Sequence, residues 1–344
     1  MVSENLAKVR ENHYFSKDLL NEWLLENYKN FGKILNIKQF IGGQSNPTFF
    51  ITSESGNELI LRKKPPGKLL PSAHAVEREY KIQKALMNSY VPCPKMFAFC
   101  EDSTIIGTPF YIMEFIKGKV IESILEVEDK KHRKRIFLQM VKMLGELHNI
   151  NYKEVGLNDF GRSGNYAERQ ISRWEKQWHL SKQRELPEID LIIKWLNKNI
   201  PNKFDSSIVH GDYRLGNLIY DLNEVSIKAV LDWELSTIGD PLADFGYMLY
   251  PYYLPVGERH GLKGCNLVEE NLPTVNEIIE TYCKVRKIKF FDPNFYVVLS
   301  MFRSVAILEG VYSRYVNGNE SSPNAKDIGN DVVPLAKATY NLIL

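Results

Sequence analysis

The sequence changes character near residue 117, and this change constrains the fold more than any other feature. Between residues 34 and 115, short runs rich in β-branched and aromatic residues are separated by Gly, Ser, Asn and Pro. Such runs predict strands joined by turns. We expect strands over 34–41, 48–52, 58–63, 96–101 and 109–115, with a helix over 16–31 capped by Ser16 and another over 72–88 capped by Ser72.

Beyond Lys117-Gly118, apolar residues recur mostly at helical spacing. Helices are expected over 129–149, 164–182, 187–199, 241–250, 272–287, 292–313 and 324–343, with short apolar runs at 208–209, 218–220 and 228–231. A small β-rich part followed by a larger helical part predicts an α+β architecture. We expect two lobes, 1–116 and 117–344, with a hinge near residues 114–118.

Composition narrows the class of protein. The formal net charge of +2 argues against extensive nucleic-acid binding. The four cysteines include no CxxC pair, so reduced thiols are expected rather than a zinc site or a disulfide framework. The N-terminal residues carry charges throughout, and no apolar run approaches the roughly 18 residues that a membrane span requires. A cytoplasmic protein without a membrane span is expected.

The segment from Ile208 to Tyr220 carries the pattern richest in chemistry. Asp212 lies in a polar loop, Asn217 follows five residues later, and Asp232 ends the next apolar run. Phosphoryl transfer to a hydroxyl needs a carboxylate to orient the hydroxyl and oxygen ligands to hold Mg²⁺. Alone, His-Gly-Asp is usually a turn. The combined spacing favours Asp212 as catalytic base, with Asn217 and Asp232 as metal ligands.

This pattern resembles a known family. His210-Gly-Asp-x-x-x-x-Asn217 is similar to the catalytic loop of aminoglycoside phosphotransferases and choline kinases, which are distant relatives of protein kinases. Segments such as GGQSNPTF, IGTPFYIMEF and VLDWELSTIGDPLADFGYML look like the kinase-like domains associated with acyl-CoA dehydrogenases. The resemblance implies a bilobal protein-kinase-like fold that uses ATP and Mg²⁺, with a small β-rich N-lobe and a larger, mostly helical C-lobe.

The resemblance assigns the nucleotide to the β-rich lobe. The turn around Ser45 and Asn46 would approach the phosphates, although a plain β-turn explains it better when it is taken alone. On the third strand Arg62 is favoured as the phosphate-binding cation, with Lys63 as the alternative. Its helix partner is Glu79, which the resemblance selects over Glu77.

The remaining nucleotide contacts are also implied by the resemblance. The adenine pocket and its edge would be formed by Met113, Glu114, Ile116, Ile219 and Leu231. Three residues, His210, Asp240 and Asp244, are expected to support the catalytic loop or cap the next helix rather than react.

The acceptor is expected to bind near Asp212. Candidate contacts are Tyr213, Arg214, Trp233, Tyr247, Tyr250 and Arg303, and for each a packing or surface role is an open alternative. The C-terminal third has no dense acidic run, which disfavours a polycationic antibiotic. The basic residues from Arg62 to Lys64, with Lys68, could meet an anionic acceptor, and the resemblance suggests a hydroxylated acyl-CoA.

The sequence therefore predicts an ATP-dependent phosphotransferase acting on a hydroxyl of a small molecule. Three alternatives remain: an inactive nucleotide-binding scaffold, an aminoglycoside or choline-type kinase, and a protein kinase. The presence of Asp212, Asn217 and Asp232 argues against the inactive scaffold. The absence of GxGxxG and of a recognisable APE segment, and Asp232-Trp-Glu where protein kinases have DFG, argue against a protein kinase.

Overall fold

Two compact units make up the chain, and neither is one continuous stretch of sequence. The computed structural model describes residues 6–41, 46–67, 74–162, 164–202, 205–318 and 325–344. The first unit comprises Met1–Val120 with Leu218–Ser236, and the second comprises Ile121–Asn217 with Thr237–Leu344. Each unit is described by itself below.

An antiparallel six-stranded sheet forms the first unit, in the order β1-β2-β3-β4-β6-β5. Its strands are β1 (Leu6–Ala7), β2 (Ile34–Phe40), β3 (Thr48–Ser53), β4 (Glu58–Lys63), β5 (Met96–Cys100) and β6 (Phe110–Glu114). Its helices are η2 (Glu11–His13), α1 (Lys17–Asn27), α2 (Val76–Leu86) and α3 (Ser103–Ile106). The five strands expected from the sequence between residues 34 and 115 are all present.

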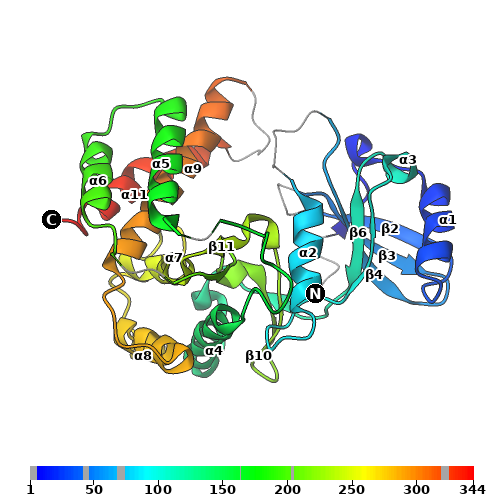
Figure 1. Cartoon of the computed structure of the whole chain (residues 1–344), viewed down its shortest axis with the longest axis horizontal. Helices are drawn as coiled ribbons and strands as arrows, with labels where there is room; N and C mark the ends of the chain where they lie inside the picture. The colour runs from blue at the N-terminus through cyan, green and yellow to red at the C-terminus, as the bar shows by residue number, and fades with distance from the viewer. Residues whose placement is uncertain (1–5, 42–45, 68–73, 163, 203–204, 319–324) are drawn as a thin grey trace. The chain divides into compact units, whose positions relative to one another are not determined.

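Helices cover both faces of this sheet, as Figure 1 shows for α1 and α2. Leu20 and Leu24 of α1 pack with Phe49, Leu61 and other residues of one sheet face. On the other face, Val76 of α2 packs with a second group, Ile60, Met96, Tyr111 and Met113. Because successive side chains in a strand point to opposite faces, β4 directs Ile60 and Arg62 towards α2 and Leu61 and Lys63 away from it.

A second, three-stranded sheet joins the first unit through a hairpin from later in the chain. Strands β10 (Ser226–Val230), β9 (Leu218–Asp221) and β7 (Lys119–Val120) pair in that order. The turn η5 (Trp233–Leu235) then packs against α2. A Cβ on Gly118 would lie 2.7 Å from the Tyr220 carbonyl oxygen, so the approach to β9 requires glycine there.

This hairpin changes the expected division of the chain. A boundary at 116/117 assigned all later residues to the helical part, whereas residues 218–236 belong to the first unit. The reason is backbone pairing: β9 bonds to β7, which the chain reaches directly from the end of the six-stranded sheet. Sequence periodicity cannot reveal such a long-range pairing.

The second unit is mostly helical. Its main helices are α4 (Lys130–Asn149), α5 (Tyr166–Ser181), α6 (Pro187–Lys198), α7 (Pro241–Leu249), α8 (Val275–Arg286), α9 (Asn294–Val316) and α11 (Val332–Tyr340). Short elements complete it: η3 (Ile124–Glu126), β8 (Ser207–Val209), η4 (Leu215–Asn217), β11 (Thr237–Gly239), η6 (Tyr250–Tyr253), α10 (Ala325–Ile328) and η7 (Gly329–Asp331). Strands β8 and β11 pair antiparallel and form a two-stranded sheet.

Helix α9 forms the centre of this unit and packs against α5, α6, α7 and α11. Figure 1 shows α5 and α9 side by side. Among the described residues, α9 is the one helix long and apolar enough to cross a membrane, with a mean hydropathy of 1.4 and 78% of that window buried. Buried core helices can be equally long and apolar, so the absence of a membrane span stays a prediction.

Three predicted helices differ most from those observed. Helix α1 ends at Asn27 instead of residue 31, although Ser16 caps it as expected. Helix α2 begins at Val76 rather than 72, and the expected cap Ser72 lies outside the described residues. The single helix expected over 324–343 is broken into α10 and α11 by the 3₁₀ turn η7 at Gly329–Asp331, where the bulk of Tyr312 faces Gly329.

Candidate active site

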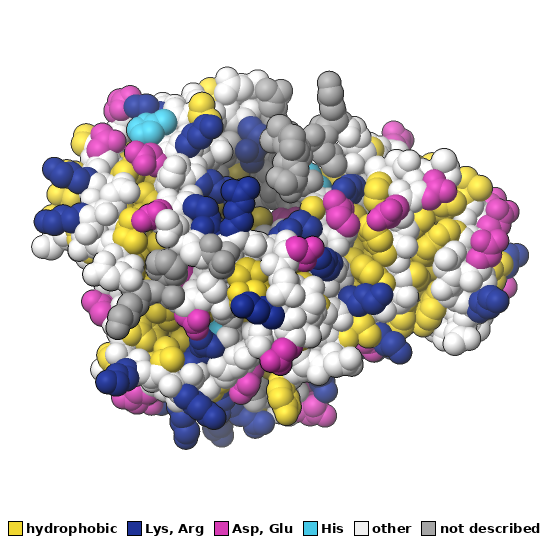
Figure 2. All heavy atoms as spheres, in the orientation of Figure 1, with side chains coloured by type: hydrophobic (Ala, Val, Ile, Leu, Met, Phe, Trp, Pro, Cys, Tyr) yellow, Lys and Arg dark blue, Asp and Glu magenta, His cyan; other side chains and the backbone are white. Residues whose placement is uncertain are grey.

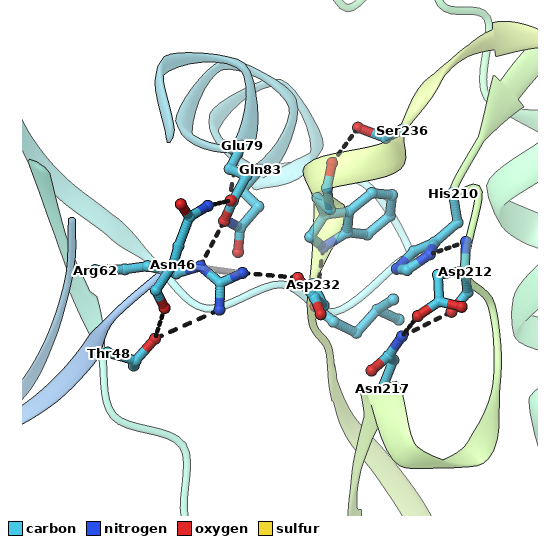
Figure 3. Close-up of polar contacts among 12 residues, drawn as sticks. Asn46, Thr48, Arg62, Glu79, Gln83, His210, Asp212, Asn217, Asp232 and Ser236 are labelled. Atoms are coloured by element: carbon cyan, nitrogen blue, oxygen red, sulfur yellow. Dashed lines mark hydrogen bonds and ion pairs between the residues drawn. The ribbon is translucent and has the colours of Figure 1, made fainter. Parts of the chain in front are cut away.

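A buried cluster of polar residues lies between β4 and α2 in the first unit (Figure 3). The Nε of Arg62 lies 2.8 Å from Oε2 of Glu79, and its Nη2 donates to Oδ1 of Asp232 at 2.7 Å. Tyr111 donates to Oε2 of Glu79 at 2.8 Å, and the amide of Asn46 donates to Oε1. Arg62 thus joins the sheet, the helix α2 and Asp232, which lies just beyond the end of β10.

The strand register explains this cluster. Arg62 pairs with Thr48 on one side and with Tyr111 on the other, and paired residues share a face of the sheet. Lys63 points to the opposite face, where its Nζ donates to the Ile106 carbonyl at 2.8 Å and burial lowers its pKa to about 8. Arg62, not Lys63, therefore faces Glu79, as the resemblance favoured.

Burial and the neighbouring charges together set the pKa values of Arg62 and Glu79 in this cluster. Burial alone would lower the pKa of Arg62, but the nearby Glu79 and Asp232 carboxylates outweigh it and raise that pKa. Burial raises the pKa of Glu79, against the opposing effects of Arg62 and the hydrogen bonds from Tyr111 and Asn46. Glu77, the rejected alternative to Glu79, instead pairs with Lys64 at the surface.

The other residues assigned to the nucleotide also lie in the first unit. Met113 is buried on the α2 face of the sheet, and the backbone N–H of Glu114 donates to the Lys95 carbonyl. Ile219 lies in β9 opposite Ala229 of β10, and Leu231 follows β10. Ile116 lies between β6 and β7.

Of the two turn residues assigned to the phosphates, only Asn46 lies within the described residues. Ser45 lies outside the described residues. Asn46 is buried, and its amide already donates to Glu79, so the structure gives its side chain a partner other than a phosphate. The Oδ1 atom of Asn46 is buried without a hydrogen bond among the described residues.

Asp232 has an uncommon backbone conformation. Its φ of 62° and ψ of 62° lie in the left-handed region, which few residues other than glycine adopt. Asp tolerates this region better than bulkier residues do, and such conformations cluster at functional sites. One carboxylate oxygen of Asp232 is bonded to Arg62, which leaves the other to serve a further ligand.

The second unit holds Asp212 in a tight loop between β8 and η4 (Figure 3). Gly211 has a φ of 86°, which makes glycine necessary at this turn. The Asn217 amide donates to the carbonyl and to Oδ2 of Asp212, both at 2.7 Å. The backbone N–H of Asp212 donates to Nδ1 of His210 at 3.2 Å. The fixed spacing from Asp212 to Asn217 thus closes one hydrogen-bonded loop.

Asp244 of α7 holds this loop through two hydrogen bonds to its backbone. Its Oδ2 and Oδ1 accept the backbone N–H groups of His210 at 2.6 Å and Gly211 at 2.8 Å. Burial would raise the pKa of Asp244, but the hydrogen bond and charge of His148 together with these amides lower it. Asp240 caps α7 at the Leu242 N–H and accepts from Tyr296. Both aspartates thus have the supporting structural roles expected of them.

Two of the acceptor candidates are packing residues. Tyr213 is fully buried and donates its hydroxyl to the Met140 carbonyl at 2.9 Å. Trp233 is fully buried and donates Nε1 to the Val230 carbonyl at 3.0 Å. Burial of both side chains removes them from the acceptor candidates, since a ligand could reach neither ring without repacking the core.

Arg214 and Tyr247 do lie beside Asp212. The Arg214 Nε lies 3.6 Å from Oδ2 of Asp212, and its Nη1 donates to Glu122 at 2.6 Å. The Tyr247 hydroxyl hydrogen-bonds to the Asp212 side chain. Burial and the Asp212 charge raise the pKa of Tyr247 well above its usual value, so this hydroxyl stays protonated and donates.

A hollow of about 520 Å³, which includes open solvent, adjoins these residues within the second unit. Its polar lining includes Glu122, Arg214 and Tyr247. Most of the rest is apolar, from Ile124, Phe137, Met140, Leu215, Met248, Tyr250, Pro251 and Leu262. The sequence pattern identified Tyr247 and Tyr250 here but missed Glu122, since nothing in its local sequence marks it.

The basic run expected to meet an anionic acceptor is already engaged. Arg62 pairs with two carboxylates, Lys63 is buried against a carbonyl, and Lys64 pairs with Glu77. Lys68 lies outside the described residues. This correction has a physical cause: strand alternation sends consecutive basic residues to different surroundings.

Each unit has one side-chain oxygen of the kind that a hard divalent ion prefers. The Asn217 side-chain amide donates its N–H groups to Asp212, so its carbonyl oxygen is left to bind another ligand. Asp232 accepts from Arg62 through Oδ1, which leaves its other carboxylate oxygen. No group of three His, Cys, Asp or Glu side chains that could hold a metal occurs among the described residues. Mg²⁺ is commonly held by one or two protein oxygens together with substrate phosphates and waters.

The β-rich sheet of the first unit and the mostly helical second unit have the architecture of kinase-like phosphotransferases. Residues 36–263 match the profile of the phosphotransferase enzyme family. The chain belongs to this family, as the resemblance of its motifs predicted.

Curated relatives are longer proteins. The chain is 37% identical over 346 residues to human acyl-CoA dehydrogenase family member 11, covering 98% of this chain and 44% of that protein. It is 40% identical to mouse acyl-CoA dehydrogenase family member 10 over 89% of this chain and 29% of that protein. The Arabidopsis thaliana relative, probable acyl-CoA dehydrogenase IBR3, is 38% identical over 92% of this chain and 41% of that protein. The chain therefore spans less than half the length of these relatives.

Solved structures agree on the fold. A crystal structure from Ralstonia eutropha JMP134, provisionally called an aminoglycoside phosphotransferase, has a TM-score of 0.86 and 37% identity, covering 96% of this chain and 98% of that one. Spectinomycin phosphotransferase in complex with ADP and spectinomycin has a TM-score of 0.62 at 15% identity, covering 94% and 98%. At that identity the likeness establishes the fold alone.

Proposed function

We propose that the protein is an ATP-dependent phosphotransferase that moves the γ-phosphoryl group to a hydroxyl of a small molecule. The observation that carries the proposal is the environment of Asp212: its carboxylate is held by Asn217 and Tyr247 beside a largely apolar hollow. Such a placement suits a base that must meet a bound organic hydroxyl.

Asp212 would orient the acceptor hydroxyl and accept its proton as the bond to phosphorus forms. An ionised carboxylate offers about four acceptor positions. The Asn217 amide and the Tyr247 hydroxyl occupy some of them, and an incoming hydroxyl can take another. Because Asp244 holds two amides of the loop, the carboxylate is fixed before the acceptor arrives.

Arg62 supports a role for the first unit in binding the phosphates. Its guanidinium is fixed by Glu79 and Asp232, a positioned cation of the kind that phosphate recognition uses. Asn217 and Asp232 are the residues that would hold Mg²⁺, which when bound neutralises charge on the transferring phosphoryl group. The adenine is assigned to Met113, Glu114, Ile116, Ile219 and Leu231.

For the acceptor, the relatives favour a hydroxylated acyl-CoA. Three curated relatives bear acyl-CoA dehydrogenase names, and this chain covers only part of each. The apolar lining of the hollow agrees with an acyl chain better than with a polycationic sugar. A cytoplasmic location without nucleic-acid partners belongs to the same proposal. Acidic side chains lie among the basic ones over the face drawn in Figure 2.

A panel of hydroxylated compounds tests the proposal. ADP release from Mg-ATP would be measured with hydroxyacyl-CoAs, aminoglycosides and choline, each with and without protein. We expect stimulation by at least one hydroxyacyl-CoA and none by aminoglycosides. Failure of every compound, together with failure to bind Mg-ATP or Mg-GTP in a thermal-shift assay, would favour an inactive scaffold.

A further inference from the structure

Alternating guanidinium and aromatic groups form a stack in the second unit. The Arg173 guanidinium lies 5.3 Å from the ring centre of Trp174, and Arg303 lies 5.6 Å from the same ring. Arg303 also lies 5.1 Å from the ring centre of Tyr247. Trp174, Tyr247 and Arg303 come from α5, α7 and α9, and α9 packs against both other helices.

This stack ends at the proposed catalytic base. The hydroxyl of Tyr247, whose ring contacts Arg303, hydrogen-bonds to the Asp212 side chain. Arg303 therefore lies about one tyrosine side chain away from the carboxylate that would accept the proton. A ligand that contacts both groups would span the length of Tyr247.

Arg303 forms no ion pair with a carboxylate among the described residues, although its Nε is buried. Arg62, Arg259 and Arg286 also have a buried Nε without a hydrogen bond, but each of them forms an ion pair. For Arg303 the described contacts are the two aromatic rings. Its Nε is buried and lacks an acceptor.

Such an arrangement is costly unless something else pairs with the charge. A buried donor without an acceptor loses its hydration without compensation. Aromatic rings interact with the faces of a guanidinium, whereas its N–H donors lie in its plane and remain available at the edge. A guanidinium held between two rings is thus prepared to donate to a planar or tetrahedral oxyanion.

We propose that Arg303 binds an oxyanion of the acceptor, a carboxylate or a phosphate, and so is a specificity-determining residue for anionic acceptors. The inference rests on the proposed function for the identity of the ligand as acceptor, but not for the binding itself. It assigns the anion site to the second unit, whereas the basic run at residues 62–64 belongs to the first unit and its side chains already have partners. Arg173, at the exposed end of the stack, supports the Trp174 ring.

Calorimetry on the full chain tests the binding directly. Saturating Mg-ADP first fills the proposed nucleotide site, and inorganic phosphate or acetate is then titrated. The ADP titration reports on the proposed function, and the anion titration reports on Arg303, so the failures of the two are distinguishable. Saturable binding of phosphate, acetate or both by the wild type supports the inference and tells which oxyanion the site prefers.

Variants then locate the bound anion. Arg303→Met should weaken binding by about tenfold or more, since it removes charged hydrogen bonds. Arg303→Lys should weaken it less, because lysine keeps the charge but lacks the planar fork. Arg314→Met is the matched control: it removes an exposed charge from the same helix and should leave binding unchanged.

Two results would overturn the inference. One is wild-type protein that binds neither anion saturably. The other is wild-type affinity retained in Arg303→Met. If Arg303→Met lowers the melting temperature, the anion affinity of Arg303→Lys is compared with that of the wild type instead. Wild-type affinity in a stably folded Arg303→Lys variant would equally contradict the inference.

Discussion

The Arg62 guanidinium donates to the Asp232 carboxylate across 2.7 Å, although the two residues are 170 positions apart in sequence. The same guanidinium lies 2.8 Å from Glu79. The first unit therefore brings a strand, a helix and the end of the β9–β10 hairpin together at one cation. Any phosphate that binds Arg62 meets a group whose position is already fixed.

Removal of this cation should destabilise the first unit. Arg62→Met leaves the buried Glu79 carboxylate without its partner, and such a change costs roughly 3 kcal/mol of unfolding free energy. Urea unfolding followed by circular dichroism measures it. Lys64→Met is the control, because its pair with Glu77 is at the surface and contributes little. Equal stability of the two variants would contradict this account of the cluster.

Asp232→Asn should weaken the binding of Mg-ATP. The amide keeps the shape of the side chain but removes the charge proposed to hold the metal, and we expect a loss of about tenfold or more, as for hydrogen bonds to charged groups. Calorimetry with Mg²⁺ and with EDTA separates metal from nucleotide. If Asp232 is a metal ligand, EDTA lowers the affinity of the wild type more than that of the variant. An equal effect on both would argue against the assignment.

Asp240 predicts a dependence of stability on pH. Burial raises its pKa from 3.8 to about 6, against hydrogen bonds from Tyr296 and Leu242. The folded state thus holds the proton more tightly than the unfolded state. The corresponding stability is fully present below about pH 3.8 and is lost as the pH rises through about 6. The loss amounts to about 3 kcal/mol.

Asp240→Asn isolates this effect. Asparagine still caps a helix but does not titrate in this range. The unfolding free energy of the wild type relative to the variant should therefore fall between pH 4 and pH 7, as measured by urea unfolding at each pH. A difference that stays constant across this range would show that the Asp240 pKa is not raised by folding.

Two tyrosines should separate packing from catalysis. Tyr213→Phe removes a buried hydrogen bond to Met140 and should cost about 1 kcal/mol of stability with little change in kcat. Tyr247→Phe removes the donor to Asp212 and should lower kcat with little change in stability. Thermal unfolding and steady-state kinetics on the same preparations measure both. A fall in kcat of the same size in both variants would contradict the assignment of Tyr213 to packing and Tyr247 to catalysis.

Much of the fold could be predicted because it depends on local pattern. Alternation in residues 58–63 placed Arg62 and Lys63 on opposite faces, and the strand register then confirmed that Arg62 meets Glu79. Helix periodicity located α4, α5 and α6 to within two residues at each end. These features depend on neighbours in sequence, which periodicity describes well.

The features that were missed depend on long-range pairing. The hairpin at 218–236 belongs to the first unit because β9 bonds to β7, which no local pattern shows. Asn46 was assigned to phosphate because it lies in a turn, but it bonds to Glu79 on a distant helix. Tyr213 and Trp233 are aromatic residues beside the motifs, and only packing shows that they are buried.

Phosphoryl transfer by Asp212→Asn tests the central claim most directly. With radiolabelled Mg-ATP and the best hydroxylated acceptor from the panel, transfer of label to the acceptor is measured for wild type and variant, with nucleotide affinity measured alongside. Removal of a general base lowers the rate by about 10²–10⁴-fold. We therefore expect transfer to fall by that factor while Mg-ATP affinity stays largely intact. Wild-type rates in Asp212→Asn would contradict the assignment of Asp212 as the base.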